Sequence, residues 1–186
     1  MASKVRFGLS DVKYALRTVD ANGNISYGSP VSLPGAVNLD LEQKGANEPF
    51  YADNIVYYQA IGNMGYQGDL EVAMIPDEFR QNILGQTLDS SSKIITEKNT
   101  DEVKTFALIF KTLTDAGERD IVLYNCTVTR PNIGGATLED TKTPATQKLS
   151  ITATPNADGK VCAYTTEATA SETITNFFTS VYGYGA

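Results

Sequence analysis

Hydrophobic side chains recur with a period of two along most of this chain. Val37, Leu39 and Leu41 alternate with polar residues, and the alternation returns at residues 70–74. Because successive side chains of a strand point to opposite faces, this period predicts half-buried β-strands. Strands are also expected at residues 12–16, 25–27, 103–112, 121–130, 148–154 and 160–165. The chain is therefore expected to be mainly β, with a β-sandwich or barrel-forming fold.

Two turn signals and one apolar run add detail to this expectation. Asn22-Gly23 predicts a hairpin that ends at residues 25–27, and Asp158-Gly159 predicts one that joins the last two strands. Residues 106–110 are continuously apolar, which is typical of a strand covered on both faces.

Two helices interrupt the strand pattern. One is expected at about residues 76–84, where Pro76 suits a first helical position. A second is expected at about residues 171–182, with Thr169 and Glu172 as a capping box. Its apolar side would comprise Ile174, Phe177, Phe178 and Val181.

The length of 186 residues favours a single domain over residues 1–186. Polar stretches at about residues 42–54, 86–102 and 131–147 are expected to be long loops. Loops of this length are uncommon in compact domains and usually either have a function or are disordered.

The negative charge is concentrated in the middle of the chain. Residues 42–102 carry eleven acidic and four basic side chains, which accounts for the whole net charge of −7. A protein that binds phosphate tightly needs clustered Lys and Arg, so this balance argues against tight nucleic-acid binding. It is compatible with a surface that DNA passes without adhering, since like charges repel within about 8–10 Å at physiological salt.

The residues that most catalytic sites need are missing or scattered. The chain has no histidine, which removes Ser-His-Asp and Cys-His mechanisms and the commonest metal ligand. Ser90-Ser-Ser-Lys93 matches the S-x-x-K pattern of penicillin-interacting enzymes, but the Ser-Asp-Asn and Lys-Thr-Gly elements that accompany it are absent. We expect neither enzymatic activity nor a metal or cofactor.

The N-terminal sequence has no apolar signal region, and no apolar run approaches the ~20 residues that span a bilayer. Synthesis in the cytoplasm without membrane insertion is expected. Cys126 and Cys162 both fall in expected strands and are interpreted as small buried apolar residues, with a bridge between them left open.

One segment is too aromatic for an idle loop and too polar for a core. Tyrosine is favoured at protein interfaces because it combines a large contact area with a polar tip. The segment predicts subunit contacts made by Glu48, Phe50, Tyr51, Asp53, Asn54, Tyr57 and Tyr58. Ordinary strand packing remains the alternative for Tyr57 and Tyr58.

A series of short motifs, in this order, resembles the major tail protein, or tail-tube protein, of bacteriophages with long non-contractile tails. The matching elements are Val5-Arg-Phe-Gly-Leu, Ala52-Asp53-Asn54 with the tyrosines after it, Gly65-Tyr66-Gln-Gly68, Ile75-Pro76-Asp-Glu-Phe79 with Leu84-Gly85, Phe106-Ala-Leu-Ile-Phe110, Val122-Leu-Tyr124-Asn125-Cys126 and Arg130-Pro131. They span most of the chain, to about residue 160.

The resemblance implies a structural virion protein. In that family a β-sandwich flanked by a helix forms six-membered rings whose inner strands close a barrel, and the rings stack into a tube. Implied partners are further copies of the chain, the tape-measure protein inside the tube, and the tail-terminator and tail-tip proteins. DNA would pass through during ejection without specific binding, and the subunits would assemble in the bacterial host cytoplasm.

One expectation concerns the surface of the channel, and one alternative concerns the function of the whole chain. The lumen of such a tube would be lined by acidic residues, with Asp69, Glu71, Asp89, Asp101 and Glu102 as candidates and Asp53 as a further one. The alternative function is a monomeric β-sandwich that binds carbohydrate or a host surface, because exposed aromatic rings also stack on sugars.

Overall fold

Nine antiparallel strands form one sheet in the computed structural model, which describes residues 5–45, 47–135, 137 and 144–184. The strand order is β2-β1-β10-β11-β12-β7-β4, with β13 paired to β11 and β3 paired to β1. These strands are β1 (Arg6–Val19), β2 (Ile25–Tyr27), β3 (Val31–Ser32), β4 (Ala36–Gln43), β7 (Tyr66–Val72), β10 (Phe106–Thr114), β11 (Gly117–Val128), β12 (Gln147–Ala153) and β13 (Cys162–Tyr164). The expected mainly β fold is confirmed.

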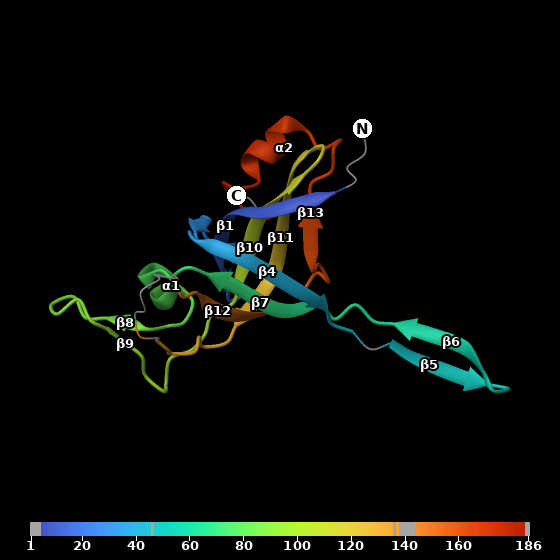
Figure 1. Ribbon diagram of the computed structural model, residues 1–186, viewed down its shortest axis with the longest axis horizontal. Coiled ribbons are helices and arrows are strands. Elements are labelled where there is room, and N and C mark those ends of the chain that lie inside the picture. The colour runs from blue at the N-terminus through green and yellow to red at the C-terminus, as the bar shows by residue number, and fades with distance from the viewer. Residues whose placement is uncertain (1–4, 46, 136, 138–143, 185–186) are drawn as a thin grey trace.

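The sheet curves around one core, so that its two ends form facing layers (Figure 1). Leu70 of β7 and Leu149 of β12 are fully buried in the same cluster as Phe106 and Leu108 of β10. Burial of apolar surface stabilises the folded state by about 25 cal/mol per Å². The alternation along β4, β7 and β12 thus directs one side of each strand inward and leaves the other side to solvent.

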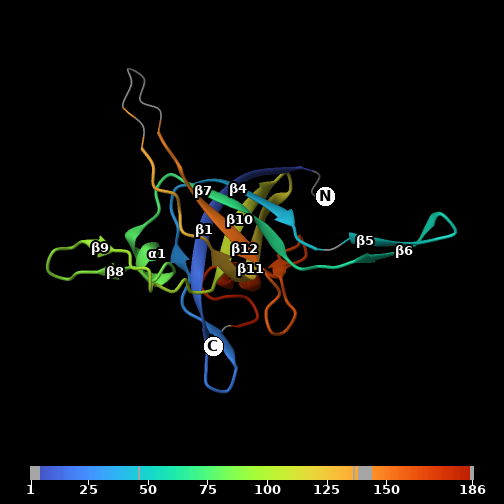
Figure 2. The same ribbon diagram turned by 90° about the horizontal axis from the view of Figure 1, so that it is seen from below.

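Two further hairpins extend from the body in opposite directions (Figures 1 and 2). The first pairs β5 (Asn47–Ala52) with β6 (Ile55–Ile61), and the second pairs β8 (Thr87–Leu88) with β9 (Ile95–Thr96). The stretches expected to be loops at residues 42–54 and 86–102 therefore contain paired strands. Of the third expected loop, at residues 131–147, positions 136 and 138–143 lie outside the described residues.

The continuously apolar run in β10 is covered on both faces, as its sequence predicts. Phe106, Leu108 and Phe110 belong to the main core, whereas Ala107 and Ile109 belong to a second cluster on the other face. That second cluster is completed by the C-terminal segment through Phe177 and Val181.

The first predicted hairpin is confirmed. β1 pairs with β2 from Arg17 opposite Tyr27 to Val19 opposite Ile25. Gly23 has a φ of 85°, and the Asp20 carboxylate accepts bonds of 2.8 Å from the backbone N–H groups of the turn. The Asn24 side chain also donates from Nδ2 to Asp20 Oδ2 at 2.8 Å, and this bond, followed by the backbone bonds, lowers the pKa of Asp20.

The second predicted hairpin is wrong, because β12 and β13 do not pair with each other. Both lie along the same edge of β11: β13 pairs with residues 121–123 and β12 with residues 126–128. The Asn156 side chain accepts bonds from Asp158 N (3.0 Å) and Lys160 N (2.9 Å), and Gly159 has a φ of 75°. The turn is real, but it moves the chain along one neighbour instead of reversing it onto itself.

Both predicted helices exist, and both are short. α1 (Asp77–Asn82) begins after Pro76, which is the N-cap residue rather than the first helical one. Phe79 is buried, and its ring packs edge-on against Tyr14 and Phe106 with centroid distances of 5.0 and 5.8 Å.

α2 (Ser171–Asn176) covers one side of the sheet but ends well before residue 182 (Figure 1). The predicted capping box is absent, because Ala170 is the N-cap and Thr169 Oγ1 instead accepts a bond of 2.8 Å from Thr166 N. Phe177 and Val181 are buried from the turns that follow the helix, so part of its expected apolar side belongs to irregular backbone.

The sequence leaves open whether the two cysteines form a disulfide bond, and the structure shows that they do not. Cys126 and Cys162 are both free thiols. Cys126 is fully buried, and this burial raises its pKa to about 12. Cys162 is only partly buried, so the expectation of a buried apolar residue holds for Cys126 alone.

Candidate assembly surfaces

Polar and acidic side chains alternate with the core residues on three neighbouring strands. In the pairing register, Asp40 of β4 stands opposite Asp69 of β7, which stands opposite Ser150 of β12. One step along, Leu39, Leu70 and Leu149 form the equivalent inward row. The outward rows form what we call the acidic face.

The acidic face is hollowed over a volume of about 520 Å³. The residues that line it include four carboxylates and two lysines: Asp40, Glu42, Asp69, Glu71, Lys44 and Lys148. Ser150 Oγ donates to Asp69 Oδ1 at 2.6 Å, and Thr146 Oγ1 donates to Glu71. The hollow therefore has an excess of negative charge, and hydrogen bonds from β12 and the residue before it hold two of its carboxylates.

The candidate lumen acids do not lie together. Asp69 and Glu71 are on the acidic face, whereas Asp89 accepts bonds from Ser91 N (2.7 Å) and Ser92 N (3.3 Å) in the β8–β9 turn. These hydrogen bonds lower the pKa of Asp89. Asp101 Oδ2 accepts from Lys98 N at 2.7 Å, and the Glu102 backbone lies against Gly85.

Two acidic residues of this face were missed by the sequence prediction. Asp40 and Glu42 occupy alternate positions of the strand whose apolar residues were recognised. The same alternation that predicts an inward apolar row also predicts their outward direction, so the signal was present in the sequence.

The predicted contact segment forms the β5–β6 hairpin, and we call it the aromatic hairpin. Its large apolar side chains are at least half exposed: Phe50 61%, Tyr51 63%, Ile55 62%, Val56 50%, Tyr57 72% and Tyr58 64%. The alternative that Tyr57 and Tyr58 pack against their own chain is therefore wrong, because both side chains are exposed. An apolar surface of this size on one element is typical of an interaction site.

The hairpin tip explains two of the other predicted contact residues. Asp53 and Asn54 have φ values of 50° and 61°, so they form a turn with both central residues in the left-handed region. Phe50 stands opposite Tyr58, and Tyr51 stands opposite Val56. Glu48 lies in β5, but its side chain is outside the described part of the structure.

The aromatic hairpin continues the β4–β7 ladder. Lys44 N donates to Gly65 O at 2.8 Å, and Met64 N donates to Lys44 O at 2.8 Å. Between these bonds and the hairpin, a Cβ added to Gly45 would lie 1.8 Å from Gly62 O, so only glycine fits there. The close approach of the two strands directs the hairpin away from the body, along the line of β4 and β7 (Figures 1 and 2).

Within the described ranges, no three or more His, Cys, Asp and Glu side chains gather in an arrangement that could hold a metal ion. No helix in the described part of the chain is long and apolar enough to cross a membrane.

Comparison with known proteins gives limited information. No protein-family model matches the chain, and no curated protein sequence matches it. Among solved structures, the tube-terminating cap of the anti-feeding prophage, determined by cryo-electron microscopy, is similar with a TM-score of 0.43 and 12% sequence identity. The similarity covers 88% of this chain and 94% of the cap chain. Both values are low, so the similarity assigns no function to this chain.

Proposed function

We propose that this chain is a structural, non-enzymatic subunit of a bacteriophage tail tube, which forms six-membered rings that stack around the tape-measure protein and later conduct DNA. The observation that carries the proposal is the continuity of two surfaces. The strands β4 and β7 present the acidic face, and backbone hydrogen bonds of Lys44 with Gly65 and Met64 join their ends to the base of the aromatic hairpin.

The acidic face suits a channel wall. Four carboxylates against two lysines give it a net negative charge, and the apolar row behind it fixes its orientation. Duplex DNA carries one negative charge per about 1.7 Å of helix axis, so a wall of the same sign keeps it from adhering. The wall would act through repulsion and shape and would need no base-specific contact.

The edge of the sheet suits ring formation. β4 is the last strand of the sheet order, and among the described strands only β7 pairs with it. An unpaired edge is a template for pairing with another chain, and closure of a ring removes such edges. A neighbouring copy would therefore continue the sheet beyond β4.

The resemblance in sequence supplies the remaining partners. A subunit of this kind would contact the tape-measure protein in the lumen and the tail-terminator and tail-tip proteins at the two ends. Its place would be the phage tail, after assembly in the host cytoplasm.

Self-assembly tests the proposal. Size-exclusion chromatography at rising protein concentration, followed by negative-stain microscopy, should give rings or tubes with a central channel. A species that stays monomeric at the highest soluble concentration would contradict it.

A monomeric binding module is the second candidate, and the exposed aromatic side chains favour it equally. Tyr57 and Tyr58 could stack on sugar rings as well as on a protein. A monomer that binds a defined glycan, and loses that binding when both tyrosines are replaced by Ala, would establish this alternative.

A further inference from the structure

A second apolar surface lies away from the aromatic hairpin, where the two ends of the sheet face each other. It is a groove of about 510 Å³ between the N-terminal half of β1 and the edge strand β4. Phe7 and Leu9 line one wall, Val37 and Leu39 line the other, and Phe110 and Cys162 are among the residues beneath. Pockets of roughly 300–1,000 Å³ enclose groups the size of a few aromatic rings.

Irregular backbone keeps the groove open. The register of β1 shifts between Phe7 and Leu9, and that of β4 shifts between Ala36 and Asn38. Gly8 in β1 has a φ of 41°. Such bulges bend a strand and interrupt its pairing. Phe7 and Val37 are consequently 54% and 56% exposed at the two rims.

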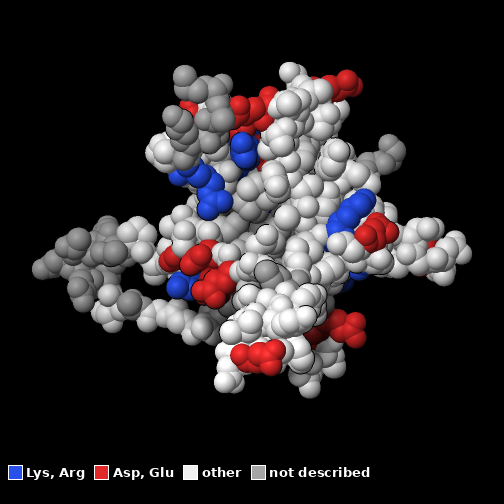
Figure 3. Space-filling model, turned by 90° about the vertical axis from the view of Figure 1, so that its right-hand side faces the viewer, with Lys and Arg blue, Asp and Glu red and all other residues white. Residues whose placement is uncertain are grey.

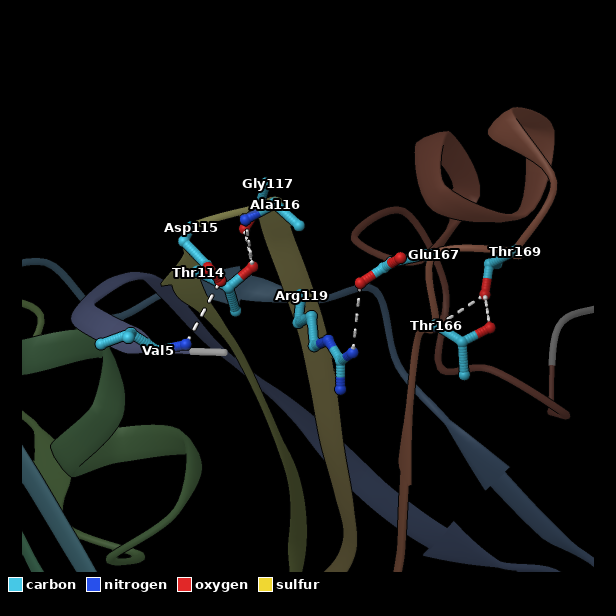
Figure 4. A network of polar contacts seen from close by, with 9 residues as sticks. All are labelled: Val5, Thr114, Asp115, Ala116, Gly117, Arg119, Thr166, Glu167 and Thr169. Atoms are coloured by element: carbon cyan, nitrogen blue, oxygen red, sulfur yellow. Dashed lines mark hydrogen bonds and ion pairs between the residues drawn. The ribbon is translucent and has the colours of Figure 1, made fainter. Parts of the chain in front are cut away.

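The groove also contains polar atoms that lack partners. The Thr112 hydroxyl lines it, is buried, and has no hydrogen-bond partner among the described residues. Arg119 stands opposite Thr112 in the pairing register, and its Nε likewise has no partner within the described ranges. The other end of that guanidinium lies 4.0 Å from Glu167 (Figure 4). Unpartnered buried groups cost free energy, so both point to an occupant that can form hydrogen bonds.

We propose that this groove receives the Phe50 and Tyr58 side of the aromatic hairpin from a second copy of the chain. The inference rests on the proposed function in one respect, since both require self-association, and it adds the surface on which the hairpin docks. Each copy would then offer one hairpin and one groove.

The hairpin cannot fill the groove of its own chain. Its base is held in the β4–β7 ladder, which aims it outward (Figures 1 and 2). A projection that fits a recess elsewhere on an identical molecule produces head-to-tail contacts, which close into rings or grow as filaments.

The chemistry of the two surfaces is complementary. Residues 47–61 contain Glu48 and Asp53 and no Lys or Arg, whereas Arg6 lines the groove beside Asp40 and Arg119 adjoins it. Figure 3 looks onto the side from which the hairpin projects and shows a large uncharged area between separate charged groups. The Tyr58 hydroxyl of the second copy can accept a hydrogen bond from Arg119 Nε and donate one to the Thr112 hydroxyl.

The pairing register selects the side that docks. Phe50 and Tyr58 stand opposite each other and share one face, and Tyr51 and Val56 stand opposite each other on the next rung. A register shift separates these two rungs, with Tyr57 as the additional residue of β6. Phe50 and Tyr51 are successive in β5 and point to opposite faces, so Val56, which is paired with Tyr51, belongs to the face that stays outside the groove. This difference provides a matched control within one hairpin.

Cross-linking to a native thiol tests the docking. Cys162 lies in the groove and is accessible in part, whereas Cys126 is buried. The variant Tyr58→Cys, treated with a short bismaleimide during assembly, should give covalent dimers and higher oligomers through Cys162 of another copy. These cross-linked oligomers should be absent for Val56→Cys and for the double variant Tyr58→Cys/Cys162→Ser.

Two outcomes would overturn the proposal in distinguishable ways. Docking in the groove would be refuted if Tyr58→Cys and Val56→Cys gave equal yields of cross-linked oligomers, or if Tyr58→Cys gave none while the wild-type protein assembles. Either result would leave the proposed function intact. A wild-type protein that remains monomeric would refute both.

Complementation gives an independent readout. A chain with Phe50→Glu/Tyr58→Glu keeps only a working groove, and one with Phe7→Glu/Val37→Glu keeps only a working hairpin; all four positions are exposed, so folding should persist. Each variant alone should need a higher protein concentration than the wild type to assemble, because the hairpin–groove contact is lost, and an equimolar mixture should form heterodimers at concentrations where neither variant associates alone. Assembly of either variant alone at the wild-type concentration, or a mixture without heterodimers, would contradict the proposal.

Discussion

Asp40 and Asp69 face each other directly across β4 and β7, both on the solvent side of the sheet. Like charges in directly opposed positions of a sheet are unfavourable, so this arrangement lowers the stability of the isolated subunit. The pair lies in the regular part of the β4–β7 ladder, from Asn38 to Gln43, and is consistent with a surface that functions through its charge.

Replacing Asp40 by Asn should stabilise the monomer. Removal of one charge from an opposed pair should raise the free energy of unfolding by about 0.5 kcal/mol, within the range of cross-strand pairs. Urea unfolding at neutral pH measures it. Asp89→Asn is the matched control and should destabilise, because its carboxylate accepts two backbone hydrogen bonds.

The aromatic hairpin should be dispensable for folding and required for assembly. The double variant Phe50→Ala/Tyr51→Ala removes exposed side chains, so its unfolding midpoint should remain near that of the wild type. Its ring or tube formation, followed by sedimentation, should require a higher protein concentration.

The opposite hairpin provides the comparison for that result. Leu88→Ala/Ile94→Ala also removes exposed apolar groups, from the β8–β9 hairpin. Equal loss of assembly in both double variants would argue against a special role for the aromatic hairpin.

Asp120 should make stability depend on pH. The side chain is buried, and neither carboxylate oxygen has a hydrogen-bond partner among the described residues. Burial raises its pKa, which Lys111 partly opposes. The folded state thus holds the proton more tightly than the unfolded chain, and the cost of the buried charge is relieved as the pH falls through the folded pKa.

The variant Asp120→Asn isolates this effect. At neutral pH it should be more stable than the wild type by on the order of 1 kcal/mol, since no charge remains buried. The advantage should shrink on acidification below the folded pKa, as followed by urea unfolding across a pH series. Glu118→Gln, on the same strand but exposed, should show no comparable gain. An Asp120→Asn advantage that grows on acidification would mean that the sign is wrong.

The C-terminal segment should contribute strongly to stability. Phe177 is 3% exposed and completes the second core cluster, so Phe177→Ala should cost about 3–5 kcal/mol. Thermal and urea unfolding measure it. Ile174→Ala, at a site 41% exposed in α2, should change stability by less than about 1 kcal/mol. Similar losses at both sites would place the burial in the helix itself.

The outward rows of the acidic face follow from local pattern, but their neighbours do not. Alternation predicts the inward side chains correctly at residues 39–41 and 70–72, whereas Val37 and Met74, at the ends of the two patterns, are 56% and 70% exposed. Nothing in either segment states that β7 lies between β4 and β12, which comes from long-range pairing. Hence Asp69 and Glu71 were recognised as acids of one surface, while Asp40 and Glu42 were not joined to them.

Turn residues likewise determine the local backbone and not the strand that is paired. Asn22-Gly23 and Asp158-Gly159 both form the tight turns that their sequences predict, because glycine tolerates a positive φ. Only the first returns the chain onto the preceding strand; after the second, the edge of β11 takes both strands. A turn signal specifies the local backbone, and the partner is decided by which free edge is within reach.

Local chemistry was sufficient for the β character of the chain, the inward side of its strands, the existence of two helices and the aromatic nature of one exposed segment. These properties depend on side-chain period, turn residues and polarity, which act over a few positions. The groove between β1 and β4, the grouping of carboxylates on one face and the burial of Phe177 beyond the end of its helix depended on the folded chain. Each arises where segments distant in sequence meet, and such contacts are selected by the packing of the whole core.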